Sequence, residues 1–90
     1  MYKLRYSSKM KKDLKNCQKR NFDLSKLEAV INQLRIPQVL EIKNRDHALT
    51  GNYIGFRECH IMPDWLLIYR YKDEYLELVR TGTHADLFRM

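Results

Sequence analysis

Apolar and polar residues alternate at the start of the chain and then recur at helical spacing. Residues 2–6 alternate between apolar and basic side chains, which predicts a short, half-buried strand. The serine pair that follows offers a side-chain cap for a helix. Met10, Leu14 and Cys17 then recur at i, i+4 and i+7, and lysines fill the remaining positions. This pattern predicts a helix with one narrow apolar stripe.

A second helix is predicted after a short polar break. Asp23 offers an N-cap, and Leu27, Val30, Ile31 and Leu34 have the spacing of a helix that faces the core. Because so few residues separate the two helical patterns, the helices are expected to form an antiparallel pair.

The second half of the chain changes to strand-like patterns. Pro37 is expected to end the second helix, and Gln38–Thr50 is predicted to be a long polar connection. Three strands are predicted after it, over Tyr53–Ile61, Trp65–Tyr71 and Tyr75–Arg80.

The predicted elements define the fold class. Residues 62–64 separate the first two of these strands, and residues 72–74 form a tight hairpin between the last two. The middle strand is apolar almost throughout and should lie at the centre of the sheet. Gly82 is expected to break the last strand and leave a polar tail. The prediction is a single α+β domain over residues 1–90, in the order β-α-α-β-β-β, with two helices on one face of a mainly antiparallel sheet.

The composition is that of a soluble globular protein, with 44% hydrophobic and 31% charged residues. The longest strongly apolar run, Trp65–Tyr69, is far too short to span a membrane. The two cysteines, Cys17 and Cys59, have no metal-binding or redox spacing, so two reduced thiols in a cytosolic protein are expected.

The net charge of +6 is concentrated at the N-terminus, where the first 20 residues contain eight basic side chains and one acidic side chain. Such a cluster favours a polyanionic partner such as nucleic acid, with Lys11, Lys12 and Lys15 as candidate contacts. The alternative is a solvated helix face that only aids solubility.

Three histidines are the main candidates for chemistry. His47 lies in the long connection, His60 near the end of a strand, and His84 just after the last strand. Taken singly, each is more often structural or merely exposed. An antiparallel sheet can bring two of its turns to the same end, so His60, Asp64, Arg80 and His84 are predicted to converge. Imidazoles transfer protons near pH 7, and a guanidinium stabilises an anionic transition state.

Metal-free cleavage of RNA fits this set of residues. The chain has no Walker loop, GxSxG elbow or HExxH helix, and a zinc site from the three histidines has no familiar ligand spacing, so no metal or cofactor is expected. Attack of a 2′-hydroxyl on the adjacent phosphorus needs one base, one acid and one cation. Trp65 and Phe88 offer aromatic faces for stacking on bases, and ordinary core packing is the alternative for Trp65.

Three segments of the chain resemble the signatures of the YafQ-like toxins, which belong to the RelE/ParE superfamily. They are DHALTGNY at residues 46–53, RECHIMPDWLLIY at 57–69 and RTGTHADLF at 80–88. The resemblance implies a toxin that enters the ribosomal A site, cleaves the mRNA there, and is held inactive by an acidic antitoxin. It also implies that Phe88 holds the A-site nucleotide, with Trp65 beside the site.

The resemblance assigns roles to the remaining site residues. His84 is expected to be the general acid that protonates the leaving 5′-oxygen. The general base for the 2′-hydroxyl is expected to be Asp64 or His60, and the alternatives stay open. Arg80 is expected to stabilise the phosphorane, and His47 to orient the scissile phosphate or to share in proton transfer.

Two other functions remain compatible with the sequence. ParE-like relatives share the fold and inhibit DNA gyrase, but such an inhibitor needs no acid–base set. A non-enzymatic nucleic-acid-binding module would depend on the lysine-rich helix more than on His84. The histidines therefore favour the nuclease.

Overall fold

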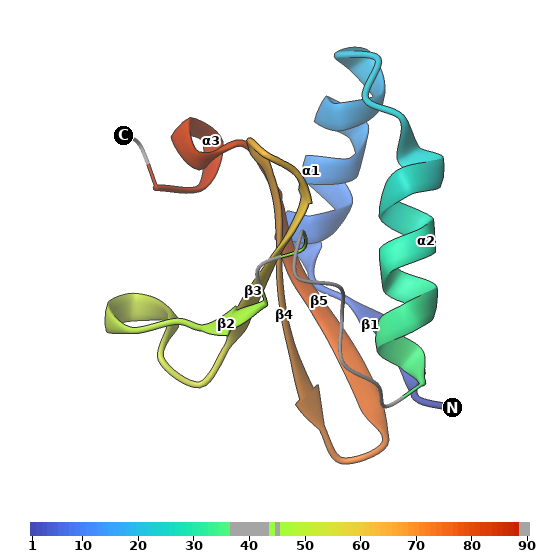
Figure 1. The fold of residues 1–90 in the computed structure, drawn as a ribbon, viewed down its shortest axis with the longest axis vertical. Helices are drawn as coiled ribbons and strands as arrows, with labels where there is room; N and C mark the ends of the chain where they lie inside the picture. The colour runs from blue at the N-terminus through green and yellow to red at the C-terminus, as the bar shows by residue number, and fades with distance from the viewer. Residues whose placement is uncertain (37–43, 45, 89–90) are drawn as a thin grey trace.

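The protein folds into a five-stranded sheet with two long helices on one face (Figure 1). The computed structural model describes residues 1–36, 44 and 46–88. The elements are, in order, β1 (Lys3–Tyr6), α1 (Ser8–Lys19), α2 (Leu24–Arg35), β2 (His47–Ala48), a 3₁₀ turn η2 (Gly51–Tyr53), β3 (Arg57–Met62), β4 (Trp65–Lys72), β5 (Tyr75–Gly82) and α3 (His84–Phe88). The strand order is β1-β5-β4-β3-β2; β1 runs parallel to β5, and the other neighbours are antiparallel. The predicted fold class is confirmed.

Side-chain caps fix where both long helices begin. The Ser7 hydroxyl accepts a hydrogen bond from the Met10 amide at 2.9 Å and donates one to the Val79 carbonyl at 2.7 Å. It therefore caps α1 and ties the helix to β5. The Asp23 carboxylate accepts a hydrogen bond from the Ser25 amide at 3.1 Å, as the sequence predicts for the start of α2. The two helices run antiparallel, side by side (Figure 1).

The two faces of the sheet bury different apolar clusters. Trp65, Leu67 and Tyr69 of the central strand β4 point toward α1 and α2, where the main core lies. Leu66 and Ile68 point to the opposite face and form a smaller cluster that Leu87 of α3 covers. This alternation is why β4 is apolar at nearly every position. Among the described helices, none has the length and apolar composition needed to cross a membrane.

The structure corrects the sequence-based prediction at the short elements. The part of the expected polar connection that is described contains β2, which pairs with β3. Residues 53–56 form turns, so β3 begins only at Arg57. β5 continues through Gly82, and a short helix, α3, replaces the expected polar tail. Such short elements are stabilised by tertiary contacts. Because they span so few residues, they leave no periodic pattern in the sequence from which they could be predicted. Pro37, which is expected to end the second helix, lies outside the described residues. So do residues 38–43 and 45 of the expected connection Gln38–Thr50.

Candidate active site

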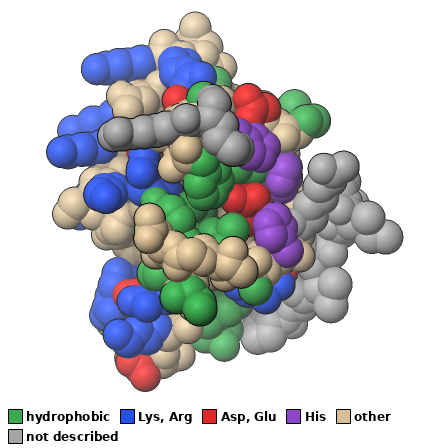
Figure 2. All heavy atoms as spheres, turned by 90° about the vertical axis from the view of Figure 1, so that its left-hand side faces the viewer, with side chains coloured by type: hydrophobic (Ala, Val, Ile, Leu, Met, Phe, Trp, Pro, Cys, Tyr) green, Lys and Arg blue, Asp and Glu red, His purple; other side chains and the backbone are tan. Residues whose placement is uncertain are grey.

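The candidate site lies on the sheet face that α1 and α2 leave uncovered. Strand pairing places Glu58, Ile68 and Arg80 in one row across β3, β4 and β5, and His60 beside Leu66 in the next row. Paired residues share a face, so these side chains project on the side of the smaller apolar cluster. Figure 2 shows histidine side chains gathered on this side, next to acidic and hydrophobic ones, with basic side chains further to the left.

Glu58 is the carboxylate that connects two of the histidines. It is 4% exposed, and its Oε1 lies 3.5 Å from Nε2 of His47 and 3.7 Å from Nε2 of His60. The backbone of His60 is held by the buried Asn44 side chain, which donates to its carbonyl at 2.8 Å. Glu58 was not predicted from the sequence as a site residue. The available signal was its position two residues before His60, because strand residues i and i+2 share a face.

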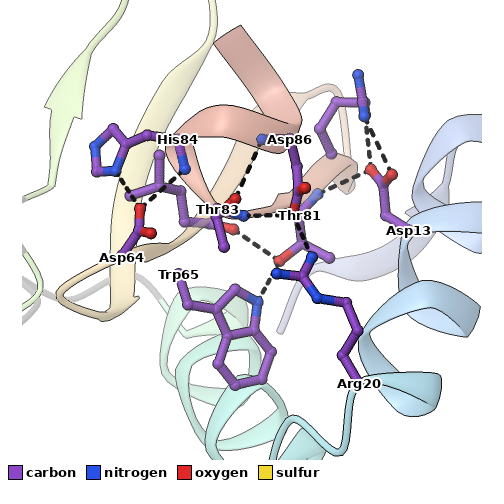
Figure 3. A network of polar contacts seen from close by, with 10 residues as sticks. Asp13, Arg20, Asp64, Trp65, Thr81, Thr83, His84 and Asp86 are labelled. Atoms are coloured by element: carbon purple, nitrogen blue, oxygen red, sulfur yellow. Dashed lines mark hydrogen bonds and ion pairs between the residues drawn. The ribbon is translucent and has the colours of Figure 1, made fainter. Parts of the chain in front are cut away.

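His84 is oriented by Asp64 from the turn between β3 and β4. Its Nδ1 lies 2.6 Å from Asp64 Oδ1, and its backbone amide donates to the same oxygen at 3.0 Å (Figure 3). These two hydrogen bonds hold the pKa of Asp64 below its usual range, and the bond from the His84 amide has a larger effect than the bond from the ring. A carboxylate that is ionised at neutral pH accepts the Nδ1 proton, which leaves Nε2 of His84 outside this contact.

Of the four residues that were expected to converge, His60, Asp64 and His84 come together, whereas Arg80 lies apart from them and binds Asp13. The ring centres of His60 and His84 lie 5.7 Å apart, edge to face, and Glu58 joins His47 to His60. The turn after β3 and the end of β5 do meet at one end of the sheet.

Arg80 stands at the other side of this face and is bound by α1. Its Nε and Nη2 donate to Oδ2 and Oδ1 of Asp13 at 2.6 and 3.1 Å. Oδ2 of Asp13 also accepts the amide proton of Thr81 at 3.1 Å. Asp13, and to a smaller extent Tyr53, raise the pKa of Arg80. Two inter-strand spacings separate the Arg80 backbone from that of Glu58, about 10 Å, with Ile68 between them.

The two aromatic candidates have different environments. Trp65 is 4% exposed in the main core, its ring packs against Phe22, and its Nε1 donates to the Thr81 hydroxyl at 2.9 Å. Stacking of Trp65 on a base is therefore a wrong prediction, and the core-packing alternative is correct. Phe88 is half-buried at the end of α3 and contacts Tyr53 edge to face, so part of its ring faces solvent on the helix that also carries His84.

The candidate contacts on α1 are accessible. Lys11, Lys12 and Lys15 are all exposed, whereas Met10 and Cys17 point into the core. Cys17 and Cys59 are free and buried, and burial raises the pKa of both thiols.

A metal ion could also be held by part of this site. Donor atoms of Glu58, His60 and His84 all lie within 4.8 Å of one another. Two imidazoles and a carboxylate suit zinc or copper, so these residues fit such an ion. The sequence leads us to expect no metal, because a zinc site made of the three histidines has no familiar ligand spacing. The group in the structure differs from that set, since Glu58 takes the place of His47.

Fold and site together define a small α+β protein with histidines and carboxylates gathered on one face of its sheet. The family described as the bacterial toxin YafQ of type II toxin-antitoxin systems matches residues 2–89. The chain belongs to this family, as the resemblance in the sequence implied.

Individual relatives cover nearly the whole chain. The mRNA interferase toxin YafQ of Escherichia coli strain K12 is 42% identical over 90 residues, 94% of each protein. YafQ in the crystal structure of the E. coli DinJ-YafQ toxin-antitoxin complex is 41% identical, with a TM-score of 0.85 over 97% of both chains. A metal-bound toxin from Helicobacter pylori is 44% identical, with a TM-score of 0.91 over 98% of this chain and 100% of the other. The expected enzyme class, an endoribonuclease that acts on mRNA, agrees with the name of the first relative.

Proposed function

We propose that this protein is an mRNA interferase that cleaves mRNA in the ribosomal A site by metal-free attack of a 2′-hydroxyl, and that an acidic antitoxin neutralises it. The observation that carries the proposal is the oriented pair His84–Asp64, which lies next to the pair His60–Glu58. One pair supplies an acid and the other a base on the same face of the sheet. The name of the E. coli relative supports the reaction class.

In the proposed mechanism, His84 is the general acid. Asp64 accepts the Nδ1 proton at 2.6 Å, so the proton on Nε2 is the one that His84 gives to the leaving 5′-oxygen. This division of roles is that of a carboxylate and an imidazole in a catalytic triad. Because its carboxylate already accepts two hydrogen bonds from His84, Asp64 is assigned a positioning role rather than that of the base.

The base is assigned to His60, with Glu58 behind it. His60 removes the proton from the 2′-hydroxyl, the 2′-oxygen attacks phosphorus, and the bond from phosphorus to the 5′-oxygen breaks. The buried Glu58 carboxylate orients His60 and balances the charge that this ring gains, and His47 shares the same carboxylate. A metal ion on Glu58, His60 and His84 would occupy the lone pairs that proton transfer needs, so the reaction is assigned to the metal-free site.

Arg80 and Phe88 would contact the substrate. Asp13 fixes the Arg80 guanidinium through two hydrogen bonds, and we assign to this guanidinium the stabilisation of the dianionic phosphorane. Phe88 holds the A-site base by stacking. The antitoxin is the expected partner because the E. coli relative was crystallised as a toxin-antitoxin complex.

Cleavage of mRNA on programmed ribosomes tests the proposal. The wild-type protein is expected to produce new ends with a 2′,3′-cyclic phosphate and a 5′-hydroxyl. An mRNA with a single 2′-deoxy nucleotide at the cleavage position serves as the matched control and should stay intact. Intact wild-type mRNA, together with inhibition of DNA gyrase in a supercoiling assay, would overturn the proposal in favour of a ParE-like function.

Replacing both Lys11 and Lys12 with alanine is expected to weaken binding to ribosomes by roughly tenfold and to reduce the salt dependence of binding by about two units in the log–log slope. The reason is that each lysine releases one counterion from RNA on binding. A salt titration of ribosome binding measures both effects. Replacing Lys26 and Lys72, which lie elsewhere on the surface, removes the same charge and should change binding much less; an equal loss in both variants would contradict a specific role of α1.

A further inference from the structure

A hollow of about 400 Å³ lies between the C-terminal half of α1 and the junction of β5 with α3. Lys19, Arg20 and Arg80 bring three positive charges to its wall, and Asp13 and Asp86 bring two negative ones. The volume is that of a typical small-ligand pocket. Nothing in the proposed cleavage mechanism uses this hollow, except that Arg80 forms part of its wall.

The hollow and the histidines lie on opposite sides of α3. His84 and Asp86 are two residues apart on this helix, about 200° around its axis, so their side chains point in opposite directions. Figure 3 shows this arrangement: His84 turns toward Asp64, and Asp86 turns toward Arg20. Arg80 is common to both regions, because it shares a sheet face with Glu58 and also lines the hollow.

The two arginines of the hollow are held in place before any ligand binds. Arg20 Nη1 donates to Asp86 Oδ2 at 2.7 Å, and its guanidinium lies 4.7 Å from the centre of the Phe22 ring. Arg80 is fixed by Asp13. A guanidinium has five N–H donors, so each arginine keeps donors beyond those that its carboxylate accepts. Among the described residues, Lys19 forms no ion pair.

We propose that this hollow binds a backbone phosphate of the substrate RNA next to the scissile one, through Arg20 and Lys19. The proposal rests on the proposed function, because that function makes RNA the ligand. Ordered guanidinium donors favour phosphate, which accepts several charge-assisted hydrogen bonds at once. The shared residue Arg80 places the hollow beside the reacting phosphate, so one RNA strand can pass over the end of α3 and contact both. An acidic segment of the antitoxin is the alternative occupant.

The test compares a hollow variant with a charge-matched control. The hollow variant is Lys19→Gln with Arg20→Gln, and the control is Lys3→Gln with Lys26→Gln, which removes two exposed cations elsewhere. The probe is a short RNA with a 2′-deoxy nucleotide at the cleavage position, so binding is measured without cleavage. The hollow variant is expected to bind it about tenfold more weakly than the wild type, and the control less than twofold more weakly. An equal loss in both variants overturns the proposal.

A second measurement changes the RNA, and the part of it that uses the wild-type protein does not depend on the folding of a variant. Single phosphates are replaced in turn by neutral methylphosphonates. One position next to the scissile phosphate is expected to lose about tenfold in affinity with the wild-type protein and little with the hollow variant. Equal losses at every position, or at none, overturn the proposal.

Two further outcomes distinguish the phosphate site from a peptide site and from the nuclease function itself. If the hollow variant binds RNA normally but binds the antitoxin more weakly, the hollow is a site for an acidic peptide and the proposal is wrong. If the wild-type protein binds the RNA probe with the expected position dependence but cleaves no mRNA on ribosomes, the phosphate site stands and the proposed nuclease function fails.

Discussion

Replacing His84 with alanine is expected to slow mRNA cleavage on programmed ribosomes by about 10²–10⁴-fold, the range that a general acid contributes. The variant loses the proton that the 5′-oxygen needs as it leaves. Its fold should be preserved, because the side chain of His84 is partly exposed and its main described contacts are with the exposed Asp64. Single-turnover cleavage at saturating protein, with circular dichroism as a check of folding, measures the effect.

Binding to the ribosome separates this effect from a loss of association. The His84→Ala variant should sediment with ribosomes as the wild type does. Lys72→Ala, at the far end of β4, serves as a control and should cleave at the wild-type rate. A His84→Ala protein that cleaves as fast as the wild type would remove His84 from the mechanism.

Replacing Asp13 with alanine is expected to lower the free energy of unfolding by about 3 kcal/mol, because the change leaves a half-buried guanidinium and a buried amide without their acceptor. Asp13 is 8% exposed and accepts hydrogen bonds from Arg80 and from the Thr81 amide. Urea denaturation measures the loss. A loss of this size is large for a domain of 90 residues, because the total stability of a domain is typically about 5–15 kcal/mol.

An exposed ion pair provides the control for the Asp13 prediction. Glu74 lies 3.6 Å from Lys3, and both side chains are about two-thirds exposed. Glu74→Ala should therefore change the free energy of unfolding by less than about 1 kcal/mol. If Asp13→Ala costs no more than Glu74→Ala, the contacts of Asp13 with β5 do not stabilise the fold.

The regular elements could be predicted from the sequence because burial leaves a periodic pattern. The helical spacing from Leu27 to Leu34 and the uninterrupted apolar run of β4 both follow from packing against the interior. The short α3 could not be predicted in this way. Its start depends on Asp86, whose carboxylate accepts the Thr83 amide proton, and on burial of Leu87 against the far face of the sheet.

The site residues were accessible to sequence reasoning to different degrees. The histidines were found because imidazole chemistry stands out in any chain and because the quoted segments resemble a known family. Glu58 was missed because an acid on a strand looks like a solvated residue until the partner strand is known. The sequence left two roles open for Trp65, because an aromatic residue beside a turn can face either the core or the solvent. Its burial in the main core is clear only from the structure. Asp13 could not be assigned to Arg80, because the pairing joins residues 67 positions apart.

The parallel pairing of β1 with β5 sets the order in which the protein can assemble during its own synthesis. β1 is made first, but its only partner strand among the described elements is the last strand of the sheet. A similar distance in sequence, 67 positions, separates Asp13 from Arg80. Such distant contacts close a large loop and form late in folding. The nascent chain therefore cannot complete its sheet or bind Arg80 to Asp13 until β5 has left the ribosome, so the mature site forms only after β5 has been translated.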